Sequence, residues 1–137
     1  MGSALRSRGD ILALEASIIG MDPGFNEGLE HFFGHQTYAR QMTLSKDSLI
    51  VGKLHRFSCV NILSKGAVRV EGEFESDTYT APHTWVSRAG TKRAIVAIED
   101  CIWTTIHGNP TNTQDMSELE NMLIAESYEA LEITWRG

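Results

Sequence analysis

The sequence predicts a mainly β protein, a closed or sandwiched β-barrel with a short helix at each end. Between residues 37 and 107, apolar and polar residues alternate with a period of two in seven short runs, which is typical of strands with one buried face. Turn residues separate these runs, and helical periodicity is confined to the two ends. Short strands at regular spacing favour an all-β barrel over a parallel α/β sheet.

A short amphipathic helix is predicted over residues 9–20, because apolar residues recur there at helical spacing. Asp10 is its expected N-cap and Gly20 its expected end. Residues 21–34 contain one proline and three glycines, so this segment is expected to be rich in turns.

The seven strand candidates are residues 37–44, 48–52, 53–63, 67–74, 84–87, 92–99 and 101–107. Their alternation suits strands that bury one face. The expected turns between them are at Lys46-Asp47, Lys65-Gly66, Ser76-Asp77, Ala89-Gly90 and Glu99-Asp100.

Helical periodicity returns near the end of the chain. The segment Ser-Glu-Leu-Glu at 117–120 has the spacing of a capping box. An apolar stripe runs beside it, formed by Met116, Leu119, Met122 and Leu123. The tail from residue 128 is expected to add a strand or a short helix. We expect a single domain with three parts: an N-terminal helix and turn-rich segment in 1–36, the barrel in 37–110, and a helix and tail in 111–137.

Composition restricts the class of partner. The chain has 137 residues, a formal net charge of −6 and a pI near 5.3, so general binding of nucleic acids or acidic membranes is not expected. No apolar run approaches the roughly 20 residues of a membrane-spanning helix. Cys59 and Cys101 lie in apolar runs without CxxC spacing and are expected to be buried free thiols in a reducing cytoplasm.

Two stretches of the chain resemble the metal-binding motifs of the cupin family, G-x5-H-x-H-x3-E and P-x-G-x2-H. His55 stands at the first histidine, while Phe57 and Asn61 stand at the second histidine and the glutamate. In the second motif Pro82 is kept, and Ser87 stands at the last histidine. The resemblance implies a cupin-like double-stranded β-helix, which is a jelly-roll barrel.

Three longer stretches resemble small cupin-like proteins encoded by tailed bacteriophages: "YARQMTLSKDSLIVGKLH", "NILSKGAVRV" and "APHTWVSRAGTKRAIVAIEDCIWTTIH". With their surroundings they span roughly residues 30 to 125. This resemblance implies a viral protein in the cytoplasm of a host bacterium. Because cupins commonly form dimers, it also implies a homo-oligomer.

The residue types at the motif positions argue against the standard cupin metal centre. A first-row transition metal normally takes three or four nitrogen, oxygen or sulfur ligands, and only His55 offers a strong one here. The expected cofactor is therefore none. The alternative is one divalent transition metal held by His55, His83 and His107, which requires the alternating face of the last strand to point inward. The simpler interpretation is that each histidine forms a hydrogen bond at the end of a strand.

Without a metal, this pocket is expected to bind a small polar or anionic ligand. Arginine matches phosphate and carboxylate in bidentate geometry, and tryptophan stacks on bases. The candidate ligand-binding residues are His55, Asn61, Arg93, Trp103, Thr105, His107 and Arg40. In the alternative interpretation, Trp103 is plain core and Arg93 forms a salt bridge outside. The basic segment at 87–93 is expected to be a solvated turn, a positive rim at the barrel mouth or a subunit seam.

Three functions fit these residues. The preferred hypothesis is a binding protein that captures a small polar or anionic ligand, with a sponge for a nucleotide defence signal as its phage version. The second is a metal-dependent or acid–base cupin enzyme such as an isomerase, epimerase or dioxygenase, which rests on His55 and His107. The third is a phage structural or assembly protein. A fold does not determine a function, so we assign no catalytic residue.

Overall fold

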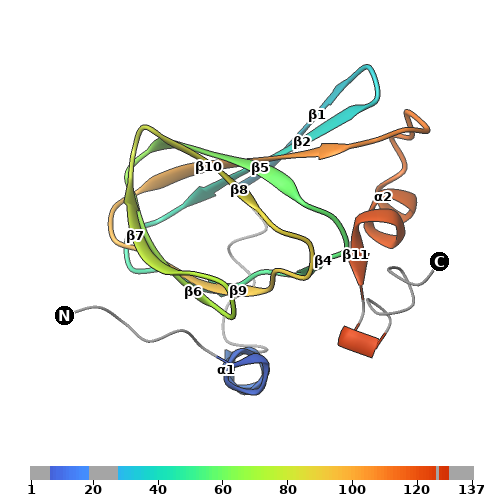
Figure 1. The fold of residues 1–137 in the computed structure, drawn as a ribbon. Coiled ribbons are helices and arrows are strands. Elements are labelled where there is room, and N and C mark those ends of the chain that lie inside the picture. Colours follow the sequence, from blue (N-terminus) through green and yellow to red (C-terminus); the bar gives the residue numbers. More distant parts are fainter. Residues whose placement is uncertain (1–6, 19–27, 126, 130–137) are drawn as a thin grey trace.

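The computed structural model describes residues 7–18, 28–125 and 127–129. Two antiparallel sheets face each other, and two short helices lie outside them (Figure 1). The larger sheet has the strand order β1-β2-β10-β5-β8, the smaller has β3-β9-β6-β7, and β4 pairs with β11. The predicted fold class, a mainly β barrel with a short helix near each end, is confirmed.

In chain order the elements are α1 (Arg8–Ile18), β1 (Leu29–Gly34), β2 (Thr37–Leu44), β3 (Leu49–Val51), β4 (Leu54–His55), β5 (Cys59–Lys65), β6 (Ala67–Gly72), β7 (Ser76–Thr80), β8 (His83–Ser87), β9 (Arg93–Ala97), β10 (Cys101–Gly108), α2 (Met116–Leu123) and β11 (Ile124–Ala125).

The period-two pattern locates most strands, among them the edge strands β3 and β8, but it merges β4 and β5 into one strand at 53–63 and misses two edge strands. Strand β2 has the predicted bounds, and β10 extends the prediction by one residue. Strands β1 and β7 lie where turns are predicted, at 21–34 and at Ser76-Asp77, so both turn predictions are wrong there. Both strands are at the edge of a sheet and mostly exposed. An edge strand with no buried face carries no alternation to detect.

The first helix begins earlier than expected. The Ser7 hydroxyl oxygen accepts a hydrogen bond from the Asp10 backbone N–H at 3.1 Å, and the Asp10 carboxylate accepts one from the Ser7 N–H at 3.2 Å. This reciprocal pair is a capping box with Ser7 as N-cap, so the prediction of Asp10 as N-cap is wrong. The predicted end at Gly20 lies outside the described residues.

Helix α2 forms where its apolar stripe predicts, but its cap is Asp115. The Asp115 carboxylate accepts hydrogen bonds from the N–H groups of Ser117 and Glu118 at 2.9 and 3.1 Å. Leu119 and Leu123 of the stripe are buried. The tail prediction lies mostly outside the described residues. None of the described helices is long and apolar enough to span a membrane.

The main core lies between the two sheets. Its members come from both sheets and are nearly all aliphatic: Leu44, Ile50, Leu63, Val68, Val70, Ile95, Ala97, Cys101 and Trp103. Both cysteines are buried free thiols, as predicted. The cavities described below lie at the end of the barrel next to α2.

The turn between β5 and β6 requires a glycine. Gly66 has φ of +85°, and a Cβ there would lie 2.2 Å from the Asp100 carbonyl oxygen. Gly66→Ala is expected to lower the free energy of unfolding by more than about 2 kcal/mol, because left-handed strain alone costs roughly 1–3 kcal/mol. Chemical denaturation measures the change. In the control Gly108→Ala, the new Cβ has no heavy atom within 4 Å. Equal losses in both variants would contradict the prediction.

Candidate functional site

Two adjoining cavities lie at the end of the barrel next to α2. The outer cavity, of about 210 Å³, is enclosed by residues of β1, β2, β10 and α2. The inner cavity, of about 250 Å³, extends between the two sheets. Four residues line both cavities, and we call these four the waist: Arg40, Lys53, His55 and His107.

Strand register explains why the waist residues meet. On β10 every second residue is buried, as the predicted inward face requires. Thr105 on this face lies opposite Arg40 of β2 on one side and Asn61 of β5 on the other. One inward step further along β10, His107 lies opposite Tyr38. The register therefore brings residues from distant parts of the chain into one row across the sheet.

His55 and His107 lie side by side, as the alternative metal site requires. Their rings are stacked with centroids 5.5 Å apart and planes 14° apart. His83 is not with them, because it stacks on Tyr79 and Trp85 with ring centroids at 4.5 and 5.1 Å. The trio that includes His83 is therefore wrong.

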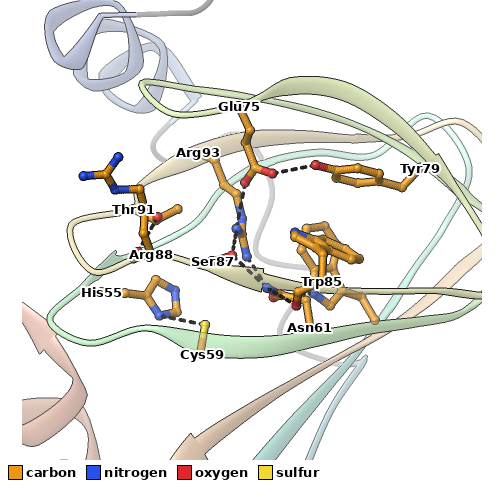
Figure 2. Close-up of polar contacts among 11 residues, drawn as sticks. His55, Cys59, Asn61, Glu75, Tyr79, Trp85, Ser87, Arg88, Thr91 and Arg93 are labelled. Carbon is orange, nitrogen blue, oxygen red and sulfur yellow. Dashed lines mark hydrogen bonds and ion pairs between the residues drawn. The ribbon is translucent and has the colours of Figure 1, made fainter.

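Cys59 stands where His83 was expected. One ligand atom from each of His55, Cys59 and His107 lies within 4.8 Å of the others, and the Cys59 Sγ is 4.0 Å from Nδ1 of His55 (Figure 2). Such a group is able to hold a metal ion. Cys59 falls four residues after His55 and on the inward face of β5. This spacing could have indicated that Cys59 lies near His55. Its apolar neighbours in the sequence instead favoured the interpretation of an inert buried thiol.

Burial keeps both imidazoles neutral at physiological pH. Burial, assisted by the positive charge of Arg93, lowers the pKa of His55 to about 3. Burial and the charge of Arg40 lower the pKa of His107 to about 4. Each ring therefore keeps one nitrogen lone pair as a potential ligand or hydrogen-bond acceptor. Burial raises the pKa of the Cys59 thiol, although Arg93 opposes that change.

Arg93 lies at the centre of a buried polar network (Figure 2). Its Nη1 donates to Glu75 Oε1 at 2.8 Å and also to the Ser87 hydroxyl. Its Nη2 donates to Asn61 Oδ1 at 3.0 Å. Tyr79 donates its hydroxyl to the other Glu75 oxygen at 2.8 Å. Arg93 is only 4 % exposed, so its charge is neutralised inside the protein rather than offered at the surface.

Asn61 and Trp103 serve this network. Asn61 is fully buried; its oxygen accepts from Arg93 and from Trp103 Nε1, both at 3.0 Å, and its nitrogen donates to Ser87 at 2.7 Å. Trp103 is also fully buried, with the Arg93 guanidinium carbon 4.9 Å from its ring centroid. Trp103 borders the inner cavity but has no exposed surface in this structure, so a role for it in ligand binding stays a prediction. Asn61 has its amide fully engaged.

The standard cupin metal centre does not fit this interior. Phe57, at the second motif histidine, has no ligand atom and is 50 % exposed. Asn61 and Ser87, at the glutamate and last histidine, both accept hydrogen bonds from Arg93. A guanidinium stays positively charged at any physiological pH. The chain therefore places a fixed cation against two of the positions that the family motif gives to a metal.

The basic segment at 87–93 is not simply a solvated turn. Thr91, Lys92 and Arg93 are at most 9 % exposed. The segment pairs with β4, since the His55 N–H donates to the Thr91 carbonyl at 3.0 Å and the Gly90 N–H donates to the His55 carbonyl at 2.9 Å. These two hydrogen bonds fix the backbone of His55.

Arg40 carries a charge that nothing neutralises in the described part of the chain. Its side chain is partly buried, and burial lowers its pKa, although arginine stays protonated at neutral pH. No hydrogen bond or ion pair joins it to another described residue. Lys53 differs, because it forms an ion pair with Glu120 of α2. Arg40 is thus the cation at the waist that remains available.

Replacing Arg93 tests the buried network. Arg93→Met is expected to lower the free energy of unfolding by roughly 3–5 kcal/mol, because removing one member of a buried ion pair leaves the other uncompensated. Arg88→Met is the control: this arginine is exposed and only covers the Phe74 ring, so its loss should cost less than about 1 kcal/mol. Denaturant titration measures both. Similar small losses would mean that the network contributes little stability.

Similarity to solved structures identifies the fold of this chain. No family model and no curated protein matches the chain. Among solved structures, an RmlC-like cupin from Shewanella frigidimarina has a TM-score of 0.54 at 19% identity, covering 70% of this chain and 85% of that one. An RmlC-like cupin family protein with a double-stranded β-helix fold from Methanocaldococcus jannaschii has a TM-score of 0.51 at 14% identity, covering 60% and 80%. An acetylacetone dioxygenase from Acinetobacter johnsonii has a TM-score of 0.51 at 14% identity, covering 58% of each chain. The chain has the cupin fold, and at these identities the likeness transfers no activity.

Proposed function

We propose that this protein binds a small organic anion at the waist, with Arg40 as the principal cationic contact. The observation that carries the proposal is the state of Arg40, a partly buried cation with no partner among the described residues. Burying a charge is costly unless it is paired. A bound anion would form an ion pair with Arg40. Binding would then remove the unfavourable free energy of the unpaired guanidinium, which increases the affinity for the anion.

The remaining groups at the waist suit the same ligand. Two neutral imidazoles, His55 and His107, stand beside Arg40 and can donate a hydrogen bond to an anion without adding charge. Thr105 lines the inner cavity and offers a hydroxyl. Lys53 pairs with Glu120 at the surface, where both side chains are about half exposed, and it is close enough to Arg40 for the two charges to repel. The positive character is local, since the whole chain has a charge of −6.

The cavity walls favour a ligand with an apolar body. Away from the waist, the outer cavity is lined mainly by Leu29, Met116, Leu119, Leu123 and Ile124. The inner cavity is lined by Met42, Ile50, Val51 and Ile95, together with Trp103 and the paired Arg93. Apolar walls that surround a few polar groups are the usual composition of small-molecule sites. A carboxylate or phosphate head at the waist with a short hydrocarbon body in either cavity fits this lining.

Size favours small anions over nucleotides. Each cavity alone, at about 210 and 250 Å³, is below the roughly 300–1,000 Å³ of sites for drug-sized molecules, and the two adjoining cavities together reach only the lower part of that range. Capture of a nucleotide signal in a phage setting stays a prediction, and a nucleotide therefore belongs in the panel of test ligands.

A metal-dependent enzyme of the cupin type is the second candidate. The observation that favours it is the group formed by His55, Cys59 and His107. One solved structure of the same fold is an acetylacetone dioxygenase. Turnover of a substrate that requires added metal would favour this candidate, whereas binding without turnover would favour the first.

The homo-oligomer also stays a prediction. What supports it is an apolar row across the outer face of the larger sheet, in which the register places side by side Phe32, Ala39, Ile106, Val60 and Val86. Phe32 and Val86 are 48 and 66 % exposed. Sedimentation velocity at several concentrations would determine the subunit number.

Arg40→Met tests the proposed function. Isothermal titration with butyrate, hexanoate, benzoate, phosphate and AMP should first identify which anions the unmodified protein binds. The substitution should then weaken binding by about tenfold to a hundredfold, because a hydrogen bond to a charged group contributes about 1.5–3 kcal/mol. The ligand-free variant should melt at the same temperature as the unmodified protein or above it, because a desolvated unpaired charge is removed.

The control for this experiment is Arg88→Met, an exposed arginine outside both cavities. It removes the same charge and should leave the affinity unchanged. Undiminished affinity of Arg40→Met for every anion that the unmodified protein binds would show that the ligand lies elsewhere.

A further inference from the structure

We propose that His55, Cys59 and His107 form a three-ligand site for a borderline or soft transition-metal ion such as Zn²⁺, and that the bound anion completes its coordination. The first part stands on the geometry of the three side chains. The second part rests on the proposed function, because it requires an anion at the waist. This site is not the motif of the cupin family, with which it shares only His55.

The geometry is close to that of a bound ion. For a tetrahedral ion with bonds of about 2.0–2.3 Å, neighbouring ligand atoms lie roughly 3.3–3.6 Å apart. In the protein the three ligand atoms lie within 4.8 Å of one another, and the sulfur of Cys59 is 4.0 Å from Nδ1 of His55. Closing the group requires the ligand atoms to approach one another by about an ångström.

The backbone already holds the three residues in place. Cys59 begins β5 and His107 lies near the end of β10, two strands that pair directly. His55 is on β4, pairs with Ile124 of β11 and is hydrogen-bonded to the 90–91 segment. Tyr38 also stacks on the His107 ring, at a centroid distance of 5.8 Å. The ligands thus come from a rigid frame rather than from a loop.

The imidazole of His107 has no conventional hydrogen-bond partner. The residue is only 7 % exposed, and within the described part of the chain its ring makes stacking contacts only. Besides stacking on His107, the His55 ring has only the distant sulfur of Cys59 beside it among the described residues. Both histidines line the two cavities. A metal ion that enters there could take one nitrogen of each ring as a ligand.

The kinds of ligand atom select the ion. Two imidazoles and one thiol suit Zn²⁺ or Cu⁺ and do not suit Mg²⁺ or Ca²⁺, which require oxygen ligands. On binding, the thiol of Cys59 would release its proton to solvent, and the sulfur would bind as the thiolate.

The surrounding charges explain why an anion must take part. Arg40 lines the same two cavities as His55 and His107 and has no ion-pair partner among the described residues, so its positive charge opposes a dication that binds alone. A zinc ion, one thiolate and one monovalent carboxylate sum to zero charge. His55 and His107 line both cavities, whereas Cys59 lines neither. The uncovered side of the ion therefore faces the waist, where Arg40 can bind the second oxygen of the same carboxylate.

Metal and anion should consequently bind with positive coupling. Each ligand neutralises charge that disfavours the other, and linkage requires that the two effects be equal. Saturating hexanoate should tighten zinc binding by about tenfold, which is a coupling of about 1.4 kcal/mol, and saturating zinc should tighten hexanoate binding by the same factor.

Cobalt and zinc titrations of the full chain test the site. We expect one Co²⁺ per chain, with a near-ultraviolet thiolate-to-cobalt charge-transfer band. Cys59→Ser and Cys59→Ala should both lose the band and weaken zinc binding at least about a hundredfold, since one ligand of three is lost. His107→Gln should weaken zinc binding in the same way. Cys101→Ser is the matched control, because this second buried cysteine lies in the main core and its loss should leave the band unchanged. Melting curves confirm that each variant is folded.

The outcomes separate the two proposals. A band that persists in both Cys59 variants, or the absence of metal binding at micromolar concentration, would overturn the metal site. If metal-free protein still bound hexanoate through Arg40, the proposed function would stand without it. Metal binding that depends on Cys59, without binding of any tested anion in its presence or absence, would support the metal site and refute the proposed function.

Discussion

The arrangement of the barrel interior depends on the buried guanidinium of Arg93. It extends from β9 of the smaller sheet and donates hydrogen bonds to Asn61 and Ser87 of the larger sheet, with Glu75 supplying the compensating charge. A charge in a low-dielectric interior is tolerated only when it is paired and hydrogen-bonded. Glu75 meets this requirement with a negative charge, and Asn61 and Ser87 meet it with hydrogen-bond acceptors. Trp103 closes the network by donating to the same oxygen of Asn61.

This constraint divides the barrel into a satisfied centre and an unsatisfied end. The donors and acceptors that Arg93 contacts are paired, whereas Nε1 of the neighbouring Trp85 has no hydrogen-bond partner among the described residues. At the waist, Arg40 has no partner and His107 has only stacked rings beside it within the described residues. Groups without partners lower the stability of the fold. Binding sites contain them because a ligand can supply the missing partner. The proposed anion and the proposed metal ion both compensate groups that the folding of the chain leaves without partners.

Much of the fold could be predicted from the sequence, and the failures have physical causes. Strands with one buried face show alternation, so β2 and β10 were located within one residue. The edge strands β1 and β7 have little buried face and were interpreted as turns. The candidate site was predicted in part. His55 and His107 do meet. His83 lies four residues along β8 from Ser87, the residue that pairs with Cys59. The apolar neighbours of Cys59 in the sequence did not indicate that its thiol lies beside the two histidines.

Local patterns in the chain were sufficient for the barrel, for the two helices and for the inward face of β10, because each depends on periodicity within one segment. They were also sufficient to argue against the standard cupin metal centre, which depends only on residue types. The partners of each inward residue were settled by register between strands far apart in sequence. Register places Thr105 between Arg40 and Asn61, while Arg93 enters from the opposite sheet. Whether an arginine is neutralised like Arg93 or remains available like Arg40 depends on what the folded chain packs against it, and no single segment contains that information.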